Sequence, residues 1–341
     1  MKTFRHLWDC FLVAVAVSTL SACGDSDEVY VPQAVQSIFP TSDCMALLEN
    51  GTVMFFKITS ETTVEVSPNP NGYSGNVIVP SAVKFNKITY VVDAIGDHAF
   101  RDCTGMTRVN FPQTVTKIGQ KIFYNCDHLL SADLPHGIEE VPFRTFYGCT
   151  ALTSVTIPSE VRNIAEGAFF GCSSLPKVTL PDSLRTIGED GFRDCASLPT
   201  LSFPECLTDI GEDAFHGCKM IDNLTLPEGM HGIDRWCFSY CANLKNVTLP
   251  EGINYLSDYA FCGCESLGTI RMPESVQTIG HKAFSECPAL KILYLGNPEP
   301  PRIFKDTFDD FKKFLYVPRH KADVYRAKEM WREFETIRGQ L

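Results

Sequence analysis

The sequence has few basic residues, no apolar run long enough to span a membrane, and no insertion that breaks its regular spacing. Lysine and arginine together number 30 against 41 acidic residues, so the formal net charge is −11. This balance argues against nucleic acid and anionic lipid as partners, because both bind to basic surfaces. The apolar run at residues 10–20 is shorter than the ~20 residues that a membrane-spanning helix requires.

Short motifs that mark catalytic or metal sites are also absent. The sequence contains no Gly-rich phosphate loop after a strand, no G-x-S-x-G, no H-E-x-x-H and no C-x-x-C. The eight histidines are scattered and lack the spacing of metal ligands. We therefore expect a protein that is not an enzyme, with no catalytic residues, no bound metal and no cofactor.

The sequence does contain one pattern repeated nine times. Cysteine and phenylalanine each recur every 23 residues, and each phenylalanine stands three positions before its cysteine. The cysteines are Cys103, Cys126, Cys149, Cys172, Cys195, Cys218, Cys241, Cys264 and Cys287. Proline follows nine residues after every one of these cysteines except the last. A fixed period of roughly 20–50 residues is the signature of stacked repeats, so the chain is expected to form a solenoid.

The repeat that starts at Cys149 illustrates how one coil is built. Val155 and Ile157 alternate with Ser154 and Thr156, which predicts a short strand with one side facing inward. The proline that follows ends this strand, because it has no amide hydrogen to donate. A second short extended piece and a helical turn complete the coil, and the repeated phenylalanine is its large core residue.

The repeats resemble the BspA-like leucine-rich repeats of bacterial surface proteins, and the resemblance covers about residues 73–334. It implies an α/β fold class: a right-handed leucine-rich-repeat solenoid, predominantly β with short helical turns, with a parallel concave sheet and a cap at each end. It also implies adhesion to a host matrix protein, a glycan or another cell.

Three segments follow from this arrangement. Residues 44–75 are expected to form an N-terminal β cap with a hairpin turn at Asn50-Gly51, residues 76–292 the repeats, and residues 293–341 a last strand and a C-terminal capping helix. The helix is predicted over residues 321–334. Its apolar face is expected to cover the last coil, and consists of Val324, Ala327, Trp331 and Phe334.

The N-terminus has the properties of an export signal over residues 1–22. Lys2 and Arg5 precede the apolar run, and the sequence Leu-Ser-Ala-Cys that ends at Cys23 resembles the lipobox of bacterial lipoproteins. By this resemblance the thiol of Cys23 carries a lipid, and residues 23–43 form a tether. The alternative is an ordinary cleavage site with a cysteine nearby by chance. The expected location is the outer membrane or cell surface of a Gram-negative bacterium, with the periplasmic face as the alternative and the lipid anchor as the only membrane contact.

The 15 cysteines allow two interpretations. In an exported protein, so many cysteines usually form disulfides. Nine of them occupy one column, however, and an odd number cannot pair completely within that column. Their apolar flanks place them on the inner side of the coil, where a thiol behaves as a small apolar group. We predict a ladder of free thiols, with a disulfide framework as the alternative.

The outward positions of the predicted strands form the first candidate binding surface, since solenoids bind partners on such sheets. Most of these positions carry hydroxyl or amide groups. The candidate residues are Arg108, Asn110, Thr156, Lys177, Thr179, Asn223, Thr225, Asn246, Thr248, Arg271 and Tyr294. The alternative is a surface without a ligand, because threonine and serine suit any exposed strand.

A second candidate patch consists of Tyr124, Tyr147 and Phe170, which lie in register two residues before consecutive repeated cysteines. A purely structural stack of rings is favoured over an exposed contact patch. Together these features predict a monomeric, non-catalytic binding protein whose ligand is a protein or a glycan. An envelope accessory lipoprotein that holds a partner protein is the alternative, and an enzyme is the third possibility.

Overall fold

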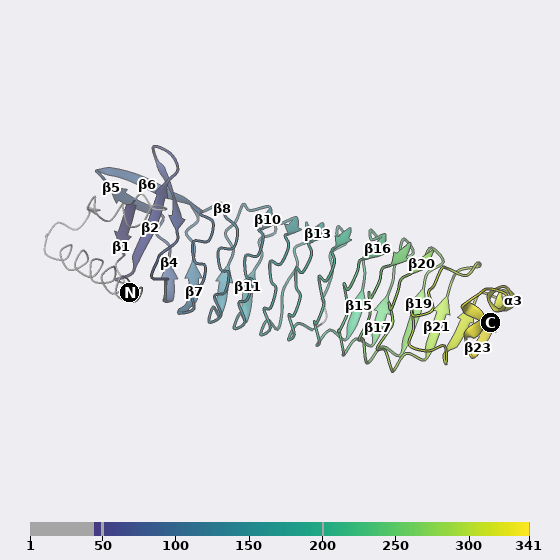
Figure 1. Ribbon diagram of the computed structural model, residues 1–341. Helices are drawn as coiled ribbons and strands as arrows, with labels where there is room; N and C mark the ends of the chain where they lie inside the picture. Colours follow the sequence, from purple (N-terminus) through teal and green to yellow (C-terminus); the bar gives the residue numbers. More distant parts are fainter. Residues whose placement is uncertain (1–43, 49–50, 200, 341) are drawn as a thin grey trace.

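The computed structural model describes residues 44–48, 51–199 and 201–340, which form an elongated stack with a sheet at one end and a short helix at the other (Figure 1). The predicted export signal, the lipid site at Cys23 and the tether over residues 23–43 lie outside the described residues. Among the described residues, no helix is both long and apolar enough to cross a membrane.

A mixed sheet forms the N-terminal end. Its strand order is β1-β2-β3-β6-β5, with β8 beside β6. The strands are β1 (Cys44–Leu47), β2 (Val53–Ile58), β3 (Thr63–Ser67), β5 (Ala82–Phe85) and β6 (Ile88–Ile95). The first three pair antiparallel, as expected for a hairpin, although Asn50 of the predicted turn is not among the described residues. The sheet continues past the predicted boundary at residue 75, because β6 pairs parallel with β3 and also with the first coil.

Most coils then contribute one strand to a ladder along one side of the stack. These strands are β4 (Gly75–Ile78), β7 (Met106–Asn110), β9 (Ser131–Asp133), β11 (Ser154–Thr156), β15 (Asn223–Thr225), β17 (Asn246–Thr248), β19 (Thr269–Met272), β21 (Ile292–Leu295), β22 (Phe314–Val317) and β23 (Thr336–Gly339). They pair in parallel within three groups, β4-β7-β9-β11, β15-β17 and β19-β21-β22-β23, and residues 23 apart in the regular repeats of a group lie side by side. We call the outward side of this ladder the strand face.

The strand ladder is parallel, as expected, and is interrupted between β11 and β15 and again between β17 and β19. Between β11 and β15, residues 175–180 and the described part of the next coil's strand position carry no strand. Pro176 and Pro199 occupy a position at which other coils donate a backbone N–H to the preceding coil. The Thr153 N–H, for example, donates to the Leu130 carbonyl oxygen at 2.9 Å. Because proline has no N–H, these two coils lose that bond.

A second ladder of two-residue strands lies on another side of the coils. It comprises β8 (Lys117–Ile118), β10 (Glu140–Val141), β12 (Asn163–Ile164), β13 (Thr186–Ile187), β14 (Asp209–Ile210), β16 (Gly232–Ile233), β18 (Tyr255–Leu256) and β20 (Thr278–Ile279). The helical turn expected around each phenylalanine is a series of tight turns. The Cys126 N–H, for example, donates to the Phe123 carbonyl oxygen at 3.1 Å, while the Phe123 N–H donates to Thr145 of the next coil at 2.9 Å.

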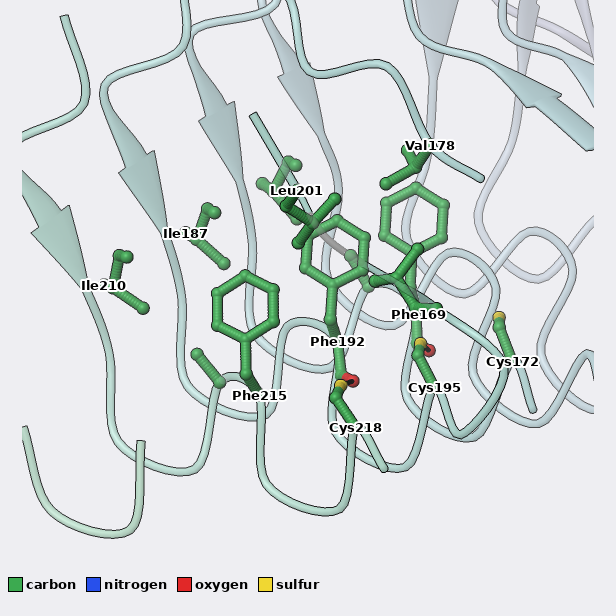
Figure 2. Close-up of a cluster of buried hydrophobic side chains, with 14 of the residues drawn as sticks. Phe169, Cys172, Val178, Ile187, Phe192, Cys195, Leu201, Ile210, Phe215 and Cys218 are labelled. Carbon is green, nitrogen blue, oxygen red and sulfur yellow. Dashed lines mark hydrogen bonds between the residues drawn. The ribbon is translucent and has the colours of Figure 1, made fainter. Parts of the chain in front are cut away.

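The repeated phenylalanines and cysteines form the core, as predicted (Figure 2). The phenylalanine rings are fully buried and stack along the axis, with centroids 4.9 Å apart between Phe169 and Phe192 and 5.4 Å apart between Phe192 and Phe215. All 13 cysteines of the described residues are free, which confirms the thiol ladder within that part of the chain. The hydrophobic contacts thus continue from coil to coil, and each coil stabilises its neighbours.

The C-terminal cap differs from the single helix predicted over residues 321–334. It consists of α3 (Ala322–Arg326), the 3-10 helix η1 (Trp331–Glu333) and the extra strand β23. Trp331 and Phe334 are buried as expected, but Ala327 is exposed and Tyr325 is buried instead. Tertiary contacts override helical spacing here, because a broken helix lets both Tyr325 and Trp331 donate to backbone carbonyls of the last coil.

Candidate functional site

The structure places most predicted binding residues side by side on the strand face. Pairs in neighbouring strands lie directly opposite each other, such as Asn223 with Asn246 and Thr225 with Thr248. The exposed members of the set are Arg108, Asn110, Thr156, Lys177, Thr179, Asn223, Thr225, Asn246, Thr248 and Arg271, and Tyr294 is half-buried. Lys177 and Thr179 belong to the proline-interrupted part of the ladder, so their backbone is not held by strand pairing.

Some polar groups of the strand face bond to each other across the coils. The Asn246 side-chain amide donates to the Asn223 side-chain oxygen at 2.7 Å, and the Thr156 hydroxyl donates to the Asp133 carboxylate. Such side-chain ladders stabilise the sheet, which agrees with the alternative of a surface that has no ligand. They also hold the side chains in fixed positions, so a ligand would meet an ordered array of donors and acceptors.

Aromatic rings and arginines replace the hydroxyl and amide groups at the C-terminal end of the strand face. The Arg271 guanidinium lies 3.9 Å from the centroid of the Tyr294 ring. The Tyr294 and Tyr316 rings stack with centroids 5.0 Å apart and planes 18° apart, and Arg338 lies opposite Tyr316 in the strand register. We call these four residues, Arg271, Tyr294, Tyr316 and Arg338, the aromatic–arginine row.

Half of this row was missed by the sequence analysis. Tyr316 and Arg338 lie after the last 23-residue repeat, where the spacing no longer identifies equivalent positions. The alternation in residues 314–317 was available as a signal, since Leu315 and Val317 are buried whereas Phe314 is 46% exposed. Strand β23 follows the segment for which a helix was predicted, so the sequence pattern did not indicate a further strand there.

The arginines of the solenoid differ in ion pairing from one face to the other. On the strand face, Arg108, Lys177, Arg271 and Arg338 have no carboxylate within ion-pair distance among the described residues. The turn face, which we define as the exposed side of the turns that carry the repeated phenylalanines, is different. Each of its arginines has an acidic neighbour, in the pairs Arg101–Asp102 (3.1 Å), Arg144–Glu166 (2.9 Å), Arg193–Asp190 (3.1 Å) and Arg235–Glu212 (3.8 Å). The strand face of this acidic protein therefore carries unneutralised positive charge.

The second predicted patch forms a closed stack on the turn face. The rings of Tyr124 and Tyr147 are 4.8 Å apart, and those of Tyr147 and Phe170 are 4.4 Å apart, with planes nearly parallel. Arg101 lies over one end of the stack at 5.1 Å and Arg193 over the other at 5.8 Å. Because ring faces are covered throughout, the half-buried rings offer only their edges to a partner.

A different aromatic cluster on the turn face was not predicted. The rings of Trp236 and Tyr259 stack at 3.8 Å, and Tyr240 packs over Gly263 of the next coil. All three aromatic residues have positive φ values of 56°, 61° and 55°. Other coils mostly place glycine, aspartate or asparagine at the Tyr240 position, whereas histidine, lysine and arginine also occur at the position of Trp236 and Tyr259. A large side chain at such a left-handed position costs about 1–2 kcal/mol. Strain of this kind is concentrated at functional sites.

One cluster of a serine, a histidine and an aspartate is present, but its geometry is not that of a nucleophilic triad. The Ser239 hydroxyl (2.7 Å) and the Asp213 carboxylate (3.3 Å) both contact the same atom of His216, Nδ1. A triad needs one partner on each ring nitrogen. Burial lowers the pKa of His216, and the nearby Arg193 lowers it further. Among the described residues, no group of three or more histidine, cysteine or acidic side chains is arranged to hold a metal.

These observations define a leucine-rich-repeat solenoid with an exposed strand face. The chain belongs to the family described as the BspA type leucine rich repeat region, whose sequence model matches residues 81–198 and 163–291 in six copies. Members of this family are typically surface and protein-interaction proteins, and their repeat fold is typically a non-catalytic scaffold. No curated protein gives a significant match.

Solved structures give the same class. The chain is similar to a leucine-rich repeat protein from Bacteroides ovatus, with a TM-score of 0.69 and 25% identity over 84% of this chain and 75% of that one. A leucine rich cell surface protein from Faecalibacterium prausnitzii is 26% identical over 78% of this chain and 58% of its own, with a TM-score of 0.38. The pneumococcal vaccine antigen PcpA is 18% identical over 88% and 100%, with a TM-score of 0.48. Of these three, the Bacteroides ovatus protein superposes well enough to support the architecture.

Proposed function

We propose that this protein is a non-catalytic adhesin-type binding protein, held at the cell surface by a lipid on Cys23, which contacts a protein or glycan through its strand face. The observation that carries the proposal is a difference in ion pairing: Arg108, Lys177, Arg271 and Arg338 on the strand face lack acidic partners in the described part of the chain, whereas the arginines of the turn face are paired. An unpaired cation can bind an anionic or polar group of a ligand without first losing an existing ion pair.

The shape of the surface supports the same proposal. The strand face presents hydroxyl, amide and aromatic groups, which in its three paired groups of strands are held by strand pairing and by hydrogen bonds between coils. A long ordered surface of this kind binds through many weak contacts rather than through one pocket. The family's typical place at the cell surface is consistent with such a ligand being outside the cell.

The proposal is tested by screening the purified chain on arrays of glycans and extracellular-matrix proteins. A variant with Thr179→Glu, Thr225→Glu and Thr248→Glu places three carboxylates on the strand face, and is expected to lose at least about tenfold in affinity for any ligand found. The control variant, Thr116→Glu with Thr208→Glu, changes exposed threonines away from the strand face. Equal binding by both variants would count against the strand face as the site.

The strained aromatic cluster favours a second candidate function, an envelope accessory subunit that holds a partner protein. Trp236, Tyr240 and Tyr259 are the kind of large side chains that dominate protein interfaces. Replacing Trp236 and Tyr240 by glycine suits their positive φ values, so the fold should tolerate the change. The measurement is cross-linking of partner proteins in native membranes, and the control variant is Lys121→Gly with Asn125→Gly. Loss of the cross-linked partners in the aromatic variant but not in the control would support the accessory function. Persistence of the partners in both variants would argue against it.

A further inference from the structure

We propose that the aromatic–arginine row is a subsite for an acidic carbohydrate, which is a sugar chain that bears carboxylate or sulfate groups. The inference rests on the proposed binding function of the strand face and assigns a ligand class to its C-terminal end. The four residues of the row belong to the four consecutive parallel strands β19, β21, β22 and β23. With strands about 4.8 Å apart, the backbones of Arg271 and Arg338 are separated by about 14 Å.

The charge of the row selects an anionic ligand. Arg271 and Arg338 are both exposed, and neither has a carboxylate within ion-pair distance in the described part of the chain. Guanidinium groups bind carboxylate and sulfate through paired hydrogen bonds, which are stronger than those between neutral groups. Because the whole chain carries a net charge of −11, this local pair of cations is not part of a generally basic surface.

The tyrosines between the arginines make the site rigid and amphipathic. The Arg271 guanidinium covers one face of the Tyr294 ring and Tyr316 covers the other. The half-buried Tyr294 ring therefore offers its edge and phenol group, and Tyr316 keeps one face that no described ring or cation covers. Exposed Phe314, opposite Ile292 in the next strand, adds an apolar floor beside them. A sugar ring has both apolar C–H groups and hydroxyls, and so complements a surface of this composition.

The same geometry disfavours two other anionic ligands. Stacking of successive nucleic-acid bases needs a series of open aromatic faces, whereas both faces of Tyr294 and one face of Tyr316 are occupied. An acidic peptide that extended the sheet would pair with the outer edge of β23. At that edge the Ile337 carbonyl oxygen already accepts a hydrogen bond from the Arg326 side chain at 2.7 Å. A hydroxyl-rich chain that lies across the strands needs neither contact, and would continue onto the Asn and Thr positions of β15 and β17.

The test measures binding of the full chain to polygalacturonate and heparin fragments as acidic polysaccharides, dextran as a neutral one and polyglutamate as an acidic peptide. We expect one or both acidic polysaccharides to bind, with an affinity that falls as salt rises, and neither dextran nor polyglutamate to bind comparably. The variant Arg271→Gln with Arg338→Gln should lose about tenfold or more. A Tyr294→Leu variant, which keeps both charges, should lose several-fold.

The control variant, Arg101→Gln with Arg235→Gln, removes the same net charge from the turn face, where both arginines are paired. It should bind the acidic polysaccharide as the unmodified chain does. Equal loss in both double variants would overturn the inference, because binding would then follow net charge alone. Comparable binding of polyglutamate, or no binding of either acidic polysaccharide, would overturn it as well. If the array screen still finds a ligand that depends on the strand face, the proposed function stands without this subsite.

Discussion

The thiol of Cys149 donates a hydrogen bond to the carbonyl oxygen of Phe123 in the preceding coil, at an S···O distance of 3.1 Å. The same oxygen also accepts the backbone N–H of Cys126 within its own coil, at 3.1 Å. The repeated phenylalanine thus offers both lone pairs of its carbonyl, and the repeated cysteine uses both its N–H and its S–H. The thiol bond recurs from Cys126 to Cys287 at 3.0–3.3 Å, which explains why the two residues keep one spacing.

Replacing Cys149 by alanine should therefore destabilise the solenoid by about 1–3 kcal/mol, because it removes the S–H donor from a buried carbonyl and leaves a small cavity. Urea denaturation followed by circular dichroism measures the change. Cys206→Ala is the matched control, since Cys206 is exposed and lies off the ladder, and its effect should stay within about 0.5 kcal/mol. Equal stability of the two variants would show that the thiol bond contributes nothing measurable.

Chemical labelling should distinguish Cys206 from the other cysteines. Of the 13 cysteines in the described residues, it is the one that is exposed, while burial raises the pKa of most ladder thiols and keeps them in the unreactive protonated form. Iodoacetamide at pH 8 should modify Cys206 in the native protein and the other twelve only after unfolding, as read by peptide mass spectrometry. Disulfide-linked ladder peptides in a non-reducing digest would instead support the disulfide framework.

Stability should fall in alkaline solution. Burial raises the pKa of Cys241 to about 12 and that of Cys262 to about 11, from an ordinary value of 9.0. The unfolded chain therefore loses these protons first, so their contribution is complete below pH 9 and is lost as the pH rises from 9 towards 12. Between its unfolded and folded pKa values, each such thiol lowers the free energy of unfolding by about 1.4 kcal/mol per pH unit. Comparing Cys241→Ala with the unmodified chain from pH 7 to 11 isolates one thiol; identical slopes would contradict the assignment.

The phenylalanine stack should be most sensitive in its centre. Phe192 is fully buried between Phe169 and Phe215, so Phe192→Ala should cost about 3–5 kcal/mol of unfolding free energy. Phe203 is only half-buried and contacts Phe215 edge-on at 5.6 Å, so Phe203→Ala should cost clearly less. Denaturant titration of both variants checks the order. A larger loss at Phe203 would mean that the stack is not the main source of stability.

The architecture was predictable from the sequence because residues 23 positions apart occupy equivalent places in successive coils and are buried or exposed alike. The spacing of phenylalanine and cysteine identified the core without any knowledge of contacts, and the strand position followed from the alternation at Val155 and Ile157. The break in the strand ladder was visible only in part. Pro176 and Pro199 can be read directly, but their effect depends on which N–H groups bond between coils.

The candidate site was less predictable, because its properties depend on neighbours in space. Whether an arginine is neutralised depends on the adjacent coil: Arg144 is paired by Glu166, 22 residues away, whereas Arg271 lies over Tyr294. The aromatic–arginine row also extends beyond the repeats, into strands that the 23-residue spacing does not reach. The strain at Trp236 is a backbone property, which residue type alone does not indicate.

The C-terminal cap provides the last prediction. The Trp331 indole N–H donates to the Pro301 carbonyl oxygen at 2.8 Å, and its buried ring packs against Tyr325 and Phe334. Trp331→Phe keeps most of the apolar contact but removes the donor, so it should cost about 1–3 kcal/mol. Trp236→Phe is the control, because the half-buried Trp236 can keep its stacking on Tyr259 as phenylalanine. Since the cap covers the last coil, hydrogen exchange in the Trp331 variant should rise first in strands β22 and β23 and leave the central coils protected. Uniform loss of protection along the stack would show instead that the solenoid unfolds as one cooperative unit.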